Sequence, residues 1–132
     1  MTAEPAAATR HTATYPGQTD QLHHVRRAIA THLAGCAAVD DAVLIASELA
    51  ANAILHSRSR AGHFTVRTEL HPGHVRIEAE DSGGPWRRRH PDGRPHGLDV
   101  VKALTGPDGW GIEITGGGRI VWARLDLDAA GE

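Results

Sequence analysis

Residues 47–57 read Ser-Glu-Leu-Ala-Ala-Asn-Ala-Ile-Leu-His-Ser, and this stretch is the most informative part of the 132-residue chain. Across residues 42–55, only Ser47, Glu48 and Asn52 are polar. Such a segment predicts a helix that is apolar nearly all round, and helices of that kind are buried. The sequence therefore places a carboxylate and an amide inside the fold.

Glu48 and Asn52 are four residues apart, and His56 follows after four more. This spacing puts all three side chains on one stripe of a helix. Burying an unpaired carboxylate costs several kcal/mol or shifts its pKa, so the stripe needs a polar partner. A magnesium ion with a phosphate is one such partner, because Mg²⁺ takes hard oxygen ligands and few protein groups. Capping of neighbouring backbone groups by the two side chains is the alternative, and the segment leaves both open.

Along the chain, some segments repeat their apolar residues at the three- and four-residue spacing of a helix, and others alternate apolar and polar residues as a strand does. The resulting order predicts an α+β fold: a two-layer α/β sandwich whose mixed, mostly antiparallel sheet is covered on one face by three helices. A single domain at residues 12–128 is expected, after a flexible tail at 1–11. The predicted elements are a strand at 12–15, helices at 18–33 and 40–57, strands at 64–70 and 75–81, a helix at 98–104, and strands at 110–115 and 119–127.

Asp81 continues the alternation of the strand that it ends, so its carboxylate is expected on the core side. Ser82-Gly83-Gly84 follows, and glycines let a ligand approach the backbone closely. A carboxylate in this position can accept a hydrogen bond from an exocyclic amine such as that of adenine. The alternative is a turn aspartate that bonds its own backbone.

The long irregular segment at 82–97 contains four glycines, three prolines and a cluster of arginines. Loops of this length inside a compact domain are usually binding loops or lids. Gly97 and Leu98 then open a helix, and helix N-termini bind phosphates through their free N–H groups.

Together these segments resemble the GHKL (Bergerat-fold) ATPases, in the form found in the anti-sigma-factor serine kinases. Residues 47–57 look like the N-box, 81–86 like the first glycine box, 97–101 like the second, and 121–125 like the final strand. The resemblance covers most of the chain, and it implies the Bergerat fold with ATP and Mg²⁺ as ligands.

The resemblance also assigns roles. Glu48 would be the general base that polarises the attacking hydroxyl, Asn52 would ligate Mg²⁺, and Asp81 would accept the adenine amine. The remaining nucleotide contacts would come from Gly83, Gly84, Gly97 and Leu98. Two positions depart from the family pattern: Pro95 stands where a glycine is usual, and Ile120 stands where a threonine is common near the start of the last strand.

The implied activity is that of a protein serine/threonine kinase. It would transfer the γ-phosphate of ATP to a serine of an anti-sigma-factor antagonist (a STAS-like protein), sequester a sigma factor, or do both. The alternative is a degenerate, non-catalytic GHKL module that only binds a partner protein.

Composition argues against several other classes of protein, namely nucleic-acid-binding, membrane and disulfide-bonded proteins. The net charge of −2 argues against a nucleic-acid partner. No apolar run approaches the roughly 20 residues that cross a bilayer, so a cytoplasmic protein without membrane contact is expected. A single cysteine allows no intramolecular disulfide. The oligomeric state is left open, a homodimer included.

Overall fold

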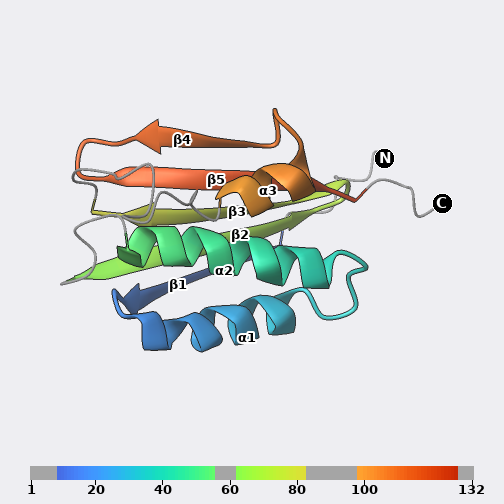
Figure 1. Cartoon of the computed structure of the whole chain (residues 1–132). Coiled ribbons are helices and arrows are strands. Elements are labelled where there is room, and N and C mark those ends of the chain that lie inside the picture. Colours follow the sequence, from blue (N-terminus) through green and yellow to red (C-terminus); the bar gives the residue numbers. More distant parts are fainter. Residues whose placement is uncertain (1–8, 56–61, 83–97, 128–132) are drawn as a thin grey trace, which may run out of the picture.

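The computed structural model describes residues 9–55, 62–82 and 98–127. Five strands form one sheet in the order β1-β2-β3-β5-β4, and the helices lie on one of its faces (Figure 1). This arrangement confirms the predicted α+β sandwich. The elements are β1 (Thr9–Pro16), a 3₁₀ turn (Thr19–Gln21), α1 (Leu22–His32), α2 (Val39–Leu55), β2 (His63–His71), β3 (His74–Asp81), α3 (Leu98–Thr105), β4 (Trp110–Ile114) and β5 (Arg119–Asp126).

The central hairpin forms where the sequence predicts it. Strands β2 and β3 pair in antiparallel register, with His71 opposite His74 and the turn at Pro72 and Gly73 between them. Alternate residues of both strands are buried. This one-sided burial is the expected result of an alternating apolar pattern in a sheet with one covered face.

Helix α2 lies over the middle of the sheet and contributes more buried hydrophobic residues to the core than any other element. It packs against α1, β3, β2, β5 and α3. Its buried residues are Ala42, Ile45, Ala46, Leu49, Ala50, Asn52, Ala53 and Ile54. Burial on so many positions explains why the segment is apolar nearly all round, as a helix covered from several sides must be.

Three predicted features differ from the structure. Strand β1 begins at Thr9, so residues 9–11 belong to the sheet and not to the tail. The first helix begins at Leu22, because residues 19–21 form a separate 3₁₀ turn. The four strand pairings within the described residues are all antiparallel, so the expectation of a mixed sheet was wrong. Two of these pairings, β2–β3 and β4–β5, join strands that are consecutive in the chain, whereas α1 and α2 lie between β1 and β2 in the sequence, and α3 and β4 lie between β3 and β5.

The other face of the sheet is covered by no described element and carries ion pairs. Arg67 bonds both Glu78, at 2.7 Å, and Glu80. The guanidinium of Arg76 lies 4.8 Å from the ring centroid of Trp122. Charged and aromatic side chains at cross-strand positions are a common way to stabilise a solvent-facing sheet surface.

Within the described ranges, no helix has the length and apolar character needed to cross a membrane.

Candidate functional site

The polar residues singled out from the sequence lie at one end of the sandwich. The C-terminal ends of α2 and β3 lie at the same end of the sheet (Figure 1). Because β3 and β5 are antiparallel, the first residue of β5 is there as well, with Asp81 opposite Arg119. Helix α2 packs on both strands. The fold thus brings the end of the apolar helix and the end of the Asp81 strand together.

Asn52 is buried, with 5% of its surface exposed, in the last turns of α2. Its side-chain Nδ2 has no hydrogen-bond partner among the described residues. Buried polar groups are nearly always paired, so an unpaired amide requires an explanation. Because a 180° flip exchanges the nitrogen and oxygen of an amide, either atom can face the missing partner. This finding argues against a role for Asn52 in capping nearby backbone groups.

Glu48 lies one helical turn before Asn52 and is partly buried. Burial raises the pKa of its carboxyl above the ordinary value. The cause is desolvation, which disfavours the charged form of an acid. A carboxylate with a raised pKa is a stronger base, which suits a proton acceptor. The neighbouring Ser47 faces α1, where its Oγ accepts a hydrogen bond of 3.0 Å from Arg26.

Asp81 is buried, as its place in the alternation of β3 predicts. Its Oδ2 lies 3.5 Å from Nε of Arg119 on the adjacent strand, and the two side chains are only 2% and 5% exposed. These are the only charged side chains in the buried set of the described residues. The carboxylate therefore has a cationic partner within the protein that the sequence analysis did not anticipate.

Arg119 could have been found from the sequence by extending the alternation of the last strand. Val121 and Ala123 are buried towards the helices, so Arg119 shares their face. Ile120 points to the open face, opposite Glu80. Arg119 is thus the β5 residue that contacts Asp81, whereas Ile120, the position that departs from the family pattern, lies on the other face of the strand.

Gly118 allows this close contact between the strand ends. A Cβ atom at this position would collide with the backbone carbonyl oxygen of Asp81. The carbonyl of Gly118 accepts a hydrogen bond of 2.9 Å from the Thr115 amide, which closes the β4–β5 turn. The backbone on both sides of the ion pair is thereby held in place.

Leu98 is the first residue of α3 and packs partly buried against the core. Its side chain is thus structural, and only its backbone is available for the predicted phosphate contact. The remaining positions singled out from the sequence lie outside the described residues: His56, Gly83, Gly84, Pro95 and Gly97.

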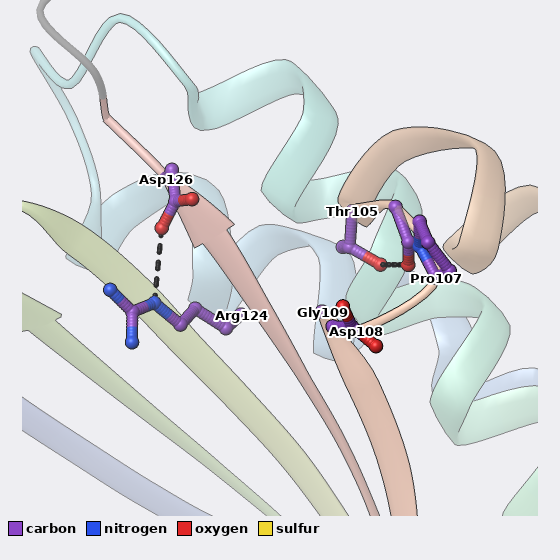
Figure 2. A pocket seen from close by; sticks show the side chains of 7 residues that line it. Thr105, Pro107, Asp108, Gly109, Arg124 and Asp126 are labelled. Atoms are coloured by element: carbon purple, nitrogen blue, oxygen red, sulfur yellow. Dashed lines mark hydrogen bonds and ion pairs between the residues drawn. The ribbon is translucent and has the colours of Figure 1, made fainter.

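A cavity of about 230 Å³ adjoins the C-terminal end of α2 and is lined by Gly17, Gln18, Thr19, Ile54 and Leu55. Two others lie away from this end of the sandwich. One of about 350 Å³ is found at the α3–β4 turn, where Arg124 Nε bonds Asp126 Oδ1 at 3.0 Å (Figure 2). It is at the far end of β5 from Arg119. Another, of about 450 Å³, lies between β1 and α1 and is lined by His11, His24, Arg27, Ala28, Thr31 and His32. Neither contains a residue predicted for the site.

No group of three or more histidine, cysteine or acidic side chains among the described residues is arranged to hold a metal ion.

Comparison with known proteins supplies the family. Residues 15–117 match the histidine kinase-like ATPase domain. The match covers more than half of the chain and spans α2, β3 and the β4–β5 turn. The chain belongs to the histidine kinase-like ATPase domain family. This confirms the resemblance that the sequence motifs indicated.

A solved structure supports the same fold for this histidine kinase-like ATPase domain. It is the crystal structure of the RsbU and RsbW domains of Rv1364c from Mycobacterium tuberculosis, which matches with a TM-score of 0.69 at 22% identity. The match covers 89% of this chain and 32% of that one, so the present chain spans about a third of its neighbour's length. A search of curated proteins gives no significant match.

Family membership implies a site for ATP, and the described residues fit one. An ATPase domain holds ATP, and Asn52 offers a buried amide whose Nδ2 has no hydrogen-bond partner among the described residues. Amide and carboxylate oxygens suit a hard cation such as Mg²⁺.

Proposed function

We propose that this chain binds ATP with Mg²⁺ between the C-terminal half of α2 and the adjoining ends of β3 and β5. We further propose that it transfers the γ-phosphate to a serine or threonine of a partner protein. The observation that carries the proposal is the unpaired buried amide of Asn52, one turn after a carboxylate of raised pKa, on a helix that is otherwise apolar. An apolar helix gains nothing in stability from such a pair, so a ligand is the simplest reason for it.

In this proposal each side chain has one task. The amide oxygen of Asn52 contributes to the coordination of the cation, which, when bound, neutralises charge on the phosphate oxygens. Glu48 accepts the proton of the attacking hydroxyl as the oxygen–phosphorus bond forms and the bond to ADP breaks. Asp81 is the acceptor for the exocyclic amine of adenine. Catalysis then rests on positioning and charge stabilisation, as in other phosphoryl transfers.

The proposed phosphate acceptor is a serine on a STAS-like anti-sigma-factor antagonist, and a sigma factor is a further proposed partner. The motif at 47–57 supports this choice, since it has the form found in anti-sigma-factor serine kinases. The solved neighbour combines an RsbW domain with an RsbU domain in one protein. Action as a soluble cytoplasmic regulator is part of the same proposal.

A second function is favoured by one observation. The carboxylate of Asp81 already has a buried cationic partner in Arg119. If that contact excludes the base, the chain is a non-catalytic module that binds a partner protein without phosphorylating it.

Two measurements separate these functions. Calorimetric titration with ATP and Mg²⁺ should give saturable binding tighter than about 1 mM, which corresponds to roughly −4 kcal/mol. Incubation with γ-³²P-labelled ATP and STAS-like antagonists of the source organism should then label a serine. Glu48→Gln should keep ATP binding and lose the labelling by at least about a hundredfold, the usual contribution of a general base.

Labelling that survives in Glu48→Gln would contradict the role of Glu48. ATP binding without transfer to any antagonist would contradict the kinase and leave the binding module. Release of phosphate without an antagonist would indicate a simple ATPase.

A further inference from the structure

The buried ion pair between Asp81 and Arg119 is not explained by stability. Burying two charges costs several kcal/mol for each ion, and apolar residues of similar volume are often as stable or more so. Yet the helix-facing side of the sheet contains this pair at 5% and 2% side-chain exposure, in a layer made mostly of valine, isoleucine and alanine. Since stability does not explain this pair, ligand binding is the better explanation for two buried charges at the ends of these strands.

The contact also has a defined geometry. The two residues are cross-strand partners, so their side chains leave the sheet side by side on the helix-facing surface. Gly118 brings the β5 backbone against the Asp81 carbonyl, and a Cβ atom there would collide with it. The backbone register thus places the two side chains next to each other at the start of their path out of the sheet.

We propose that Arg119 sets the nucleotide affinity of this site by occupying the Asp81 carboxylate that the base amine of ATP must reach. The inference rests on the proposed function, in which Asp81 accepts that amine. Only 2% of the Asp81 side chain is exposed, and Nε of Arg119 lies 3.5 Å from its Oδ2, so a base amine that approaches this oxygen meets the guanidinium. The contact at 3.5 Å is an ion pair, and the guanidinium attracts the carboxylate with a full charge that the neutral amine lacks, so the amine must displace the guanidinium at the cost of that attraction. Arg119 and the base amine therefore compete for the same carboxylate, that of Asp81.

The test compares ATP affinity in three forms of the full chain. Arg119→Ser removes the guanidinium and leaves room for water to solvate Asp81. It is expected to lower the Kd for ATP at least tenfold, which is about 1.4 kcal/mol. The matched control is Arg124→Ser on the same strand, whose guanidinium is 55% exposed and pairs with Asp126 on the open face. This control should bind ATP as the wild type does.

The gain should depend on the amino group of the base. Purine riboside triphosphate, which lacks the 6-amino group, should bind the wild type and Arg119→Ser with the same Kd, and so should inorganic tripolyphosphate. Equal tightening for all three ligands would overturn the proposal, because it would indicate a general loosening of the fold. An unchanged or weaker Kd for ATP in Arg119→Ser would overturn it as well.

Arg119→Gln guards against failure of the serine variant to fold. Glutamine keeps much of the length of arginine and offers Asp81 a neutral hydrogen-bond donor. Arg119→Gln should therefore bind ATP more tightly than wild type but less tightly than Arg119→Ser. If Arg119→Ser does not fold, the gain of Arg119→Gln over wild type is the test. No gain in Arg119→Gln with the serine variant unfolded would refute the proposal. The outcomes also separate the two claims. ATP bound equally by wild type and variants overturns the role of Arg119 alone, whereas no binding to any folded form overturns the proposed function together with it.

Discussion

Replacing Asn52 with leucine should stabilise the ligand-free protein and at the same time remove its response to ATP. The amide is buried and its Nδ2 has no partner among the described residues. An unsatisfied buried polar group costs about 1–3 kcal/mol. Leucine has the same branched arrangement of side-chain heavy atoms and no polar atoms, but its methyl groups are larger, so we expect a gain near the lower end, about 1 kcal/mol. For a domain of this size that raises the Tm by roughly 3–5 °C.

Thr68→Val is the matched control. Thr68 is fully buried in β2, opposite Ile77, and its Oγ1 also has no hydrogen-bond partner among the described residues. Valine has the same branched shape without the hydroxyl, so a similar gain in stability is expected. Thr68 belongs to the middle of the sheet and not to the strand ends, so ATP binding should be unaffected.

The assay is thermal unfolding of the three proteins with and without ATP and Mg²⁺. A ligand at 100 times its Kd stabilises the native state by about 2.7 kcal/mol. Wild type and Thr68→Val should show this ligand-dependent shift, and Asn52→Leu should show almost none. A residue that binds ligand at the expense of stability has this double signature, whereas a structural residue does not.

Two results would refute the reasoning. If Asn52→Leu lowers the Tm while Thr68→Val raises it, the amide has a partner that stabilises the fold. If Asn52→Leu is more stable but keeps the full ATP-dependent shift, the amide is buried for reasons unrelated to the nucleotide.

Three further predictions follow from other contacts. Because burial raises the pKa of Glu48, its ionised form is disfavoured in the folded state, so wild type should lose stability relative to Glu48→Gln as pH rises from about 4 through the raised pKa. Urea unfolding at several pH values checks this, and a wild type that gains stability relative to Glu48→Gln as pH rises would contradict it. Gly111→Ala should destabilise the protein by about 1–3 kcal/mol, because a Cβ there would lie 2.8 Å from the indole of Trp122; an unchanged midpoint of urea unfolding would show that the ring moves freely. Arg67→Met should lower the free energy of unfolding by about 0.5–1 kcal/mol, because it removes the ion-pair partner of Glu78 and Glu80. The loss, measured by urea unfolding, should be smaller in high salt; a loss that does not depend on salt would indicate lost packing instead.

Much of the fold followed from local patterns. The alternation in residues 64–70 and 75–81 predicted both central strands and their turn, because one face of the sheet is covered and the other is not. The all-round apolar character of α2 predicted its burial. The start of β1 was missed, because Thr9 to His11 lie in an edge strand whose side chains are mostly exposed and carry no apolar alternation.

The candidate site was only half visible from the sequence. Glu48 and Asn52 could be found because polar residues on an apolar helix break a local rule. Arg119 was missed because an arginine at the start of a strand breaks no such rule. Its importance lies in its register with Asp81, and that register depends on a pairing between residues far apart in the chain.

The sequence by itself determined the element types, the buried helix with its carboxylate and amide, and a family match over residues 15–117. These depend on spacing along the chain, which helix and strand geometry convert directly into faces. Only the tertiary structure decided that Arg119 and not Ile120 faces Asp81, and that Nδ2 of Asn52 has no hydrogen-bond partner among the described residues. Both facts are contacts made across elements, and the free energy of such contacts depends on burial and distance that no local pattern contains.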